Sequence, residues 1–247
     1  MEGTMIEAYA ARVAGVRERL RSCATTKRLC DPDLDPDVFL RWLIEFSSYG
    51  VQNTKPVVRW MTQAGEHMMA QGFEEIGAAF KAHGKHEGGH DELMVADTHR
   101  LVARWNAKHG DSLDAEALIN RPPTPSVQLY VDLHEDLAAG DRPWRNLAIA
   151  REIEGVATTI GPMVLDQCRR VLGEEGMKEV SFIVDHVELD VGHTASDDKM
   201  IDRLLTKRPE LLDEMAERGE VTLDAYIGFL EECFIEADAW VERQRAA

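Results

Sequence analysis

The stretch His186-Val-Glu-Leu-Asp190-Val-Gly-His193 carries two imidazoles and one carboxylate at helical spacing. At about 100° per residue, positions i, i+4 and i+7 fall within about 60° of one another on a helix, so His186, Asp190 and His193 point the same way. The residues around them are mostly apolar. Because so many polar groups in an apolar helix indicate a shared purpose, the stretch predicts a helix that binds a metal ion.

The same spacing occurs in the earlier stretch His83-Gly-Lys-His86-Glu87-Gly-Gly-His90, where His83, Glu87 and His90 stand at i, i+4 and i+7. Its glycines are unexpected, since each costs about 1 kcal/mol relative to alanine inside a helix. They predict a bulge, a break or the close approach of another backbone. We expect Glu87 and His90 to bind metal. The pattern leaves His83 open as a ligand, as support for a ligand or as a surface residue.

Apolar residues recur at steps of three and four along nearly the whole chain, which is typical of amphipathic helices. No strand-like alternation or hairpin turn appears, so the sequence predicts an all-α fold. Pro162 should kink the longest of the helices. The expected helices span approximately 5–21, 36–46, 57–69, 73–90, 91–109, 114–119, 126–137, 144–172, 179–193, 197–205, 209–218 and 222–241.

The chain of 247 residues is long enough to bury a substantial core without disulfides or structural metals. A metal would therefore serve chemistry rather than folding. The segment Arg121-Pro-Pro-Thr-Pro125 is the clearest connector, but no change of composition follows it. We therefore expect a single domain over residues 1–247.

The charge balance of 28 Lys and Arg against 45 Asp and Glu gives a net charge of −17, without a basic cluster. Nucleic acids and anionic membranes are poor partners for such a chain. Four scattered cysteines, no basic and apolar leader and no run of about 18 apolar residues predict a cytoplasmic protein that does not span a membrane. Amphipathic helices at both ends would suit a homodimer face.

Carboxylates and imidazoles without thiolates suit iron, manganese or zinc, so ligand type alone leaves the metal open. Glu87 and His90 have the Glu-x-x-His spacing of ferritin-type di-iron proteins. The later helix has His-x3-Asp-x2-His instead, which points away from that class.

Three segments resemble the haem-oxygenase-like di-iron oxidases and oxygenases, a family with a helical haem-oxygenase fold that binds two irons. The stretch from His83 to Leu93 is similar to the family's His-x-x-Glu-Glu-x-x-His-Asp segment, although His86 stands where the family has its first glutamate. Ile153-Glu154-Gly155 is similar to its central-helix glutamate, and the stretch from Phe182 to Thr194 to its His-x3-Asp-x2-His helix.

Carried over by position, the resemblance implies six metal ligands: Glu87, His90, Glu154, His186, Asp190 and His193. We favour Glu154 over Glu152 because it shares a helix side with the small residues Ala157 and Gly161, which leaves room for a cluster. Some relatives have a wider spacing between the glutamate and the histidine of the first motif. Glu92 and His99 match that spacing, so they are alternative ligands, or supports for a ligand, on the helix of the first motif.

The resemblance also implies an activity. Two ferrous ions would use O2 as co-substrate to oxidise a small organic molecule such as an amino acid, an amine or a fatty acid, by N-oxygenation, desaturation or C–C cleavage, as in specialised metabolism. An external electron donor would fit such a cycle. We expect substrate contacts near Glu45, Tyr49 and Gln52.

Two alternatives stay open at this point. One is a metal-free enzyme of the same fold, similar to thiaminase or quinone-cofactor enzymes, in which the histidines bind substrate. The other is a helical metal-binding protein without catalysis. A haem-degrading enzyme fits less well, because the first histidine of the chain is His67, well after the N-terminus.

Overall fold

A computed structural model shows helices joined by short turns; it describes residues 3–110, 112–138 and 140–246, without the side chains of residues 137, 138 and 188–191. These ranges contain no strand, which confirms the predicted all-α fold. In chain order the helices are α1 (Met5–Ser22), α2 (Ala24–Leu29), α3 (Pro36–Thr54), α4 (Val57–Ala70), α5 (Glu74–His86), α6 (His90–His109), α7 (Ala115–Ile119), α8 (Pro125–Ala138), α9 (Arg145–Leu172), η1 (Glu174–Glu179), α10 (Ser181–Lys207), η2 (Pro209–Leu211) and α11 (Leu212–Ala246).

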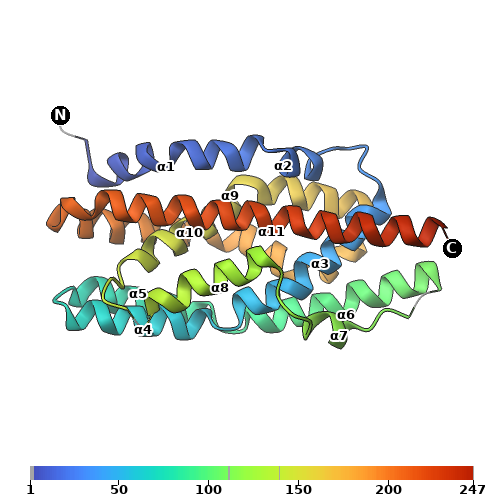
Figure 1. Cartoon of the computed structure of the whole chain (residues 1–247), viewed down its shortest axis with the longest axis horizontal. Helices are drawn as coiled ribbons and strands as arrows, with labels where there is room; N and C mark the ends of the chain where they lie inside the picture. Colours follow the sequence, from blue (N-terminus) through green and yellow to red (C-terminus); the bar gives the residue numbers. More distant parts are fainter. Residues whose placement is uncertain (1–2, 111, 139, 247) are drawn as a thin grey trace.

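Helix α11 runs along the length of the molecule, with the two chain ends at opposite ends of the bundle (Figure 1). It packs against α1, α3, α8 and α9, while α4 pairs with α5, α3 with α6 and α9 with α10. The helices that carry the predicted metal motifs, α5, α6, α9 and α10, are thus held together by direct packing.

The core of this single domain is built around Trp42 of α3. Its ring stacks on those of Phe39 and Phe46, with centroids 5.9 and 5.1 Å away. Its indole Nε1 donates to the Leu230 carbonyl of α11 at 3.1 Å. The buried indole is thereby satisfied, and it ties the central helix to the longest one.

Two predicted helix ends are wrong. Helix α10 continues past His193 to Lys207, and α11 joins residues 212–218 of the segment predicted at 209–218 with the whole of the one predicted at 222–241, after the short helix η2 (Pro209–Leu211). Gly219 does not end a helix; it allows α1 to approach, because a Cβ there would lie 2.6 Å from the Tyr9 hydroxyl. Packing of this kind outweighs the low helix propensity of such residues.

The glycines after α5 do break the helix, as predicted. Residues 87–89 form a turn, and Gly89 has a φ of 93°, a conformation that L side chains rarely adopt. Pro162 lies inside α9, which continues through it to Leu172, and the predicted kink there stays a prediction.

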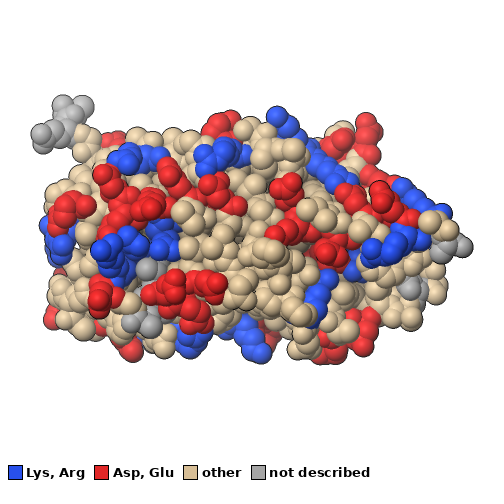
Figure 2. Space-filling model, in the orientation of Figure 1, with Lys and Arg blue, Asp and Glu red and all other residues tan. Residues whose placement is uncertain are grey.

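The outer surface is consistent with the charge balance of the chain. Figure 2 shows acidic and basic side chains interspersed over the face that contains α11 and α8, without a continuous basic stretch. None of the described helices is both long enough and apolar enough to cross a membrane. The cytoplasmic location and the expected partners stay predictions.

Candidate metal centre

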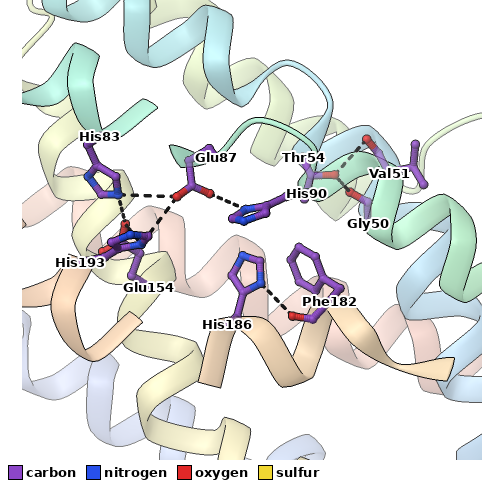
Figure 3. Close-up of polar contacts among 10 residues, drawn as sticks. All are labelled: Gly50, Val51, Thr54, His83, Glu87, His90, Glu154, Phe182, His186 and His193. Carbon is purple, nitrogen blue, oxygen red and sulfur yellow. Dashed lines mark hydrogen bonds and ion pairs between the residues drawn. The ribbon is translucent and has the colours of Figure 1, made fainter. Parts of the chain in front are cut away.

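Six histidine and glutamate side chains from four helices and one turn converge in the interior (Figure 3). They form two groups, and within each group the potential ligand atoms all lie within 4.8 Å of one another. The first group is His83, Glu87, Glu154 and His193; the second is Glu87, His90 and His186.

The first group brings together α5, α9 and α10. His83 Nε2 lies 2.7 Å from Glu154 Oε1 and 3.6 Å from Glu87 Oε1. His193 Nδ1 lies 3.7 Å from Glu87 Oε1 and 3.9 Å from Glu154 Oε1. Two imidazole nitrogens and two carboxylate oxygens therefore surround one small space, as the ligands of a single ion would.

The second group lies beside the first. His90 Nδ1 is 2.8 Å from Glu87 Oε2, and the rings of His90 and His186 are 4.4 Å apart. His186 Nδ1 donates to the Phe182 carbonyl at 2.8 Å, which directs its Nε2 away from its own helix. This hydrogen bond orients the ring in the way typical of metal-binding histidines.

Glu87 belongs to both groups because its two oxygens face in different directions. Oε1 faces the first group and Oε2 the second. Glu87 caps the C-terminal end of α5, and His90 begins α6 just beyond the turn at Gly89. The helix break places both side chains at the centre and gives Glu87 the position of a bridging carboxylate.

Asp197 supports the centre from behind. It is fully buried on α10, and its Oδ1 accepts from His83 Nδ1 at 3.2 Å. A carboxylate behind a ligating imidazole fixes its tautomer and orientation. Asp197 was not among the predicted site residues, although it stands four residues after His193 and would have been found by extending the helical stripe by one turn.

The pKa shifts of the clustered side chains indicate that their carboxylates are stabilised by positive charge nearby. Burial alone would lower the pKa of His83, yet hydrogen bonds to three surrounding carboxylates raise it to about 12. Burial also opposes ionisation of Glu87, but the histidines beside it hold its pKa far below the usual range. Burial lowers the pKa of His186 to about 4, which keeps its ring neutral and able to bind a metal.

These side chains fit a pair of divalent cations. Buried carboxylates so close together are unfavourable unless cations compensate them, and here a single protonated imidazole does much of that work. Metal ions would take over this role by displacing the proton from His83. The donor set of imidazoles and carboxylates without thiolates suits iron, manganese or zinc.

The structure brings five of the six predicted ligands together: Glu87, His90, Glu154, His186 and His193. The side chain of Asp190 lies outside the described residues, and its role stays a prediction. His83, which the sequence left open, stands in the first group between Glu154 and Asp197. That these residues bind metal also stays a prediction.

Three other expectations about the site can be placed. Glu92 and His99 are exposed on α6, and His99 Nε2 contacts Glu116 Oε1 at 3.0 Å, so the structure does not bring them to the centre. Glu152 is buried away from the centre, where it accepts from Arg17 at 2.6 and 2.8 Å and from the Tyr9 hydroxyl at 3.0 Å. The choice of Glu154 over Glu152 agrees with this arrangement.

The predicted substrate contacts Glu45, Tyr49 and Gln52 face Arg121 instead of the centre. Arg121 pairs with Glu45, its guanidinium lies 3.5 Å from the Tyr49 ring centroid, and Gln52 Nε2 donates to its carbonyl at 3.0 Å. These contacts clamp the Pro-rich connector onto α3. The prediction selected a stripe about 100° around the helix from the one that faces the interior cavity of the bundle.

This cavity of about 150 Å³ is lined mainly by α3, α9, α10 and α11, with further residues from α4, α5, α6 and α8, and it reaches the centre at Glu87, Glu154 and His186. On α3 the cavity is lined by Trp42, Phe46, Gly50, Asn53 and Thr54. Phe46, Gly50 and Asn53 each come one position after a residue that the sequence analysis predicted. Most of the other lining side chains are aliphatic or aromatic. A small organic molecule in this cavity would lie against the centre in surroundings that exclude water.

Comparisons with known proteins support the architecture. No family model and no curated protein matches the chain. Among solved structures, it is similar to a domain of unknown function with a haem oxygenase-like fold from Shewanella denitrificans OS217, with a TM-score of 0.72, 17% identity and 95% and 94% of the two chains covered.

It is also similar to a TenA homolog from Pseudomonas syringae pv. tomato, with a TM-score of 0.70, 18% identity and 92% and 91% coverage. A CADD-like protein of unknown function from Nostoc punctiforme PCC 73102 follows, with a TM-score of 0.61, 14% identity and 94% and 99% coverage. The chain therefore has the haem-oxygenase-like fold that its motifs predicted.

Proposed function

We propose that the protein is a non-haem di-iron enzyme that uses O2 to oxidise a small organic molecule. The observation that carries the proposal is the pair of donor groups sharing Glu87 beside a mostly apolar cavity. Two ferrous ions held there would supply electrons for the reduction of O2. An external electron donor would re-reduce the centre where the substrate does not.

The residues of the chain have separate tasks in this proposal. His83, Glu154 and His193 would hold one ion, His90 and His186 the other, and Glu87 would lie between them. Asp197 and the Phe182 carbonyl orient two of the imidazoles. The apolar cavity wall excludes water, which protects an oxidising centre from side reactions.

Anaerobic titration of the metal-free protein with ferrous iron, followed by stopped-flow mixing with O2, tests this proposal. We expect uptake of about two irons per chain, from the two donor groups, and a transient visible absorption band after mixing. His186→Ala should lose the second iron, whereas the matched control His99→Ala, on the exposed face of α6, should bind both. Absence of iron uptake, or iron inert to O2, would contradict the proposal.

A metal-free enzyme is the second candidate, because the TenA homolog shares the fold over nearly its whole length. In that case the histidines would bind substrate directly. The same titration separates the two candidates, since a metal-free enzyme takes up no stoichiometric iron. Repeating it with manganese and zinc tests which metal the donor set prefers.

A further inference from the structure

A groove of about 930 Å³ on the outer surface collects positive charge from separate parts of the chain. Helix α6 contributes Arg100, Arg104 and Lys108, which follow one another at steps of four residues and so lie about 6 Å apart along one side of the helix. Lys178 of η1 adds a fourth basic side chain, and Glu179 is the one acidic residue among the described residues that line the groove. The lining therefore carries four positive charges against one negative charge, in a chain whose net charge is −17.

The cations of α6 have acidic partners, but each partner is more deeply buried than its cation. The exposed fraction of the side chain is 46% for Arg100 against 1% for Asp97, and 34% for Arg104 against 14% for Glu179. Lys108 and its own partner differ in the same sense. The positive ends of these ion pairs thus lie outermost, and the groove presents positive charge to a molecule that approaches from solvent.

The rest of the lining is apolar. Pro36 and Leu40 come from the start of α3, Ala103 and Ala107 from α6, and Val171 from the end of α9. Such side chains beside exposed cations suit a protein partner, because protein interfaces combine apolar contact with a polar rim. Cations about 6 Å apart, spread over about 12 Å of helix, match separate carboxylates on a protein surface better than the directly linked phosphates of a nucleotide.

A series of hydrogen bonds connects the groove to the second donor group of the centre. Arg100 Nη1 donates to Asp97 Oδ1 at 3.1 Å, and Asp97 Oδ2 accepts from the backbone N–H of Phe182 at 2.9 Å. The carbonyl of the same Phe182 accepts from His186 Nδ1 at 2.8 Å (Figure 3). Along α6, Arg100 is only about 15 Å from His90. An electron that enters at Arg100 therefore has a route of hydrogen bonds and one residue of backbone to a candidate metal ligand.

We infer that this groove is the docking surface for an acidic protein that carries electrons to the centre. That the docked protein is an electron donor rests on the proposed function, but docking itself does not require a metal. Each docked carrier gives up one electron and leaves oxidised, so two encounters supply the two electrons that return two ferric ions to the ferrous state. Because the chain as a whole is strongly acidic, it repels such a carrier elsewhere, and the groove determines where the carrier binds.

The first test is binding of the metal-free protein to an oxidised, acidic [2Fe–2S] ferredoxin, measured by isothermal titration calorimetry at low and high salt. We expect affinity to fall about tenfold or more between about 25 and about 250 mM salt, because exposed charges are screened. The double substitution Lys108→Gln with Lys178→Gln should weaken binding at low salt by about tenfold. Lys55→Gln with Lys207→Gln removes the same charge from exposed positions at the ends of α3 and α10, and this matched control should bind as the unmodified protein does.

The second test is stopped-flow reduction of the iron-loaded, oxidised protein by reduced ferredoxin below saturation. The Lys108 and Lys178 double variant should be reduced about tenfold more slowly than the control double variant, because loss of rim charges slows association. Dithionite at high salt requires no docking surface and should reduce both variants at the same rate. Equal rates with ferredoxin would overturn the inference.

The binding test has further outcomes that would overturn the inference. One is the absence of binding at low salt both by this ferredoxin and by an acidic flavodoxin, and another is equal binding by the two double variants. Stoichiometric binding of inorganic pyrophosphate that is lost in the Lys108 and Lys178 double variant would assign the groove to a small anion and also overturn it.

Docking and iron uptake are measured independently of each other. Salt-dependent docking without iron uptake would support the docking surface and reject the di-iron proposal. Iron uptake without docking would reject the docking surface alone.

Discussion

Gly89 offers a test of whether the turn between α5 and α6 sets the metal centre. Its φ is 93°, and a Cβ at this position would meet nothing within 4 Å. Gly89→Ala therefore adds no clash, and its effect comes from the backbone alone. For an L residue the left-handed region costs about 1–2 kcal/mol.

The metal-free protein can relieve this strain by relaxing the turn, which shifts His90 relative to Glu87. Metal binding must then restore the original turn, because it needs both side chains in place. Affinity at the second position should fall by the strain that is reimposed, about fivefold to thirtyfold for 1–2 kcal/mol. The first position, built mainly on α5, α9 and α10, should change less.

Gly72 provides the matched control, since its φ is 87° and its Cβ position is equally open, between α4 and α5 and away from the centre. Gly72→Ala should lower the free energy of unfolding by a similar amount and leave metal affinity unchanged. Urea denaturation and anaerobic competition titration with a metal-binding dye measure the two quantities. Equal metal affinity in both variants would refute the role of the turn.

Four further substitutions have defined outcomes. Asp197→Asn should weaken the first metal position by about 10–100-fold, because His83 loses its carboxylate support; dye competition measures this, with the neighbouring Asp198→Asn as control. Burial lowers the pKa of His134 to about 4. As pH falls from 6.5 to 4 the unfolded chain therefore gains a proton that folded His134 does not, and about 3 kcal/mol of stability is lost. His134→Gln should flatten the dependence of the unfolding free energy on pH over this range, and an unchanged slope would contradict the assignment. Glu152→Gln removes the partner of Arg17 and Tyr9 and should cost about 1–3 kcal/mol in urea denaturation without reducing iron uptake. Glu45→Gln leaves buried Arg41 without its charge partner and should cost about 3–5 kcal/mol, again with full iron uptake; a loss of iron would show that the Arg121 clamp supports the centre.

Helical periodicity is sufficient to predict the fold class and most of the centre. On one helix, spacing determines direction, so the sequence alone places His186 and His193 on a common face. The choice between Glu152 and Glu154 follows from the same rule, since two positions apart on a helix means opposite sides. Both predictions need information from a single helix.

Three parts of the site needed information about neighbouring helices. Glu45, Tyr49 and Gln52 form a valid stripe of α3, but the side that faces the cavity depends on where α9 and α11 pack. Asp197 was missed because continuation of α10 beyond His193 depends on packing rather than on local propensity. His83 could not be assigned because the turn at Gly89 decides where α5 ends relative to the centre.

The two metal positions differ in how they meet the cavity. His186 is the one imidazole of the two groups that lines it among the described residues, while His83 contacts Asp197 and His193 lies beside Glu87 and Glu154. Under the proposed function, a substrate in the cavity would therefore meet the His186 imidazole of the second position and the Glu154 carboxylate of the first. The first position, with four side chains around it and a buried carboxylate behind, would be the better-fixed of the two. Glu87 belongs to both donor groups and stands at a helix end beside a glycine turn, so under the proposed function it would be the carboxylate held between the two ions.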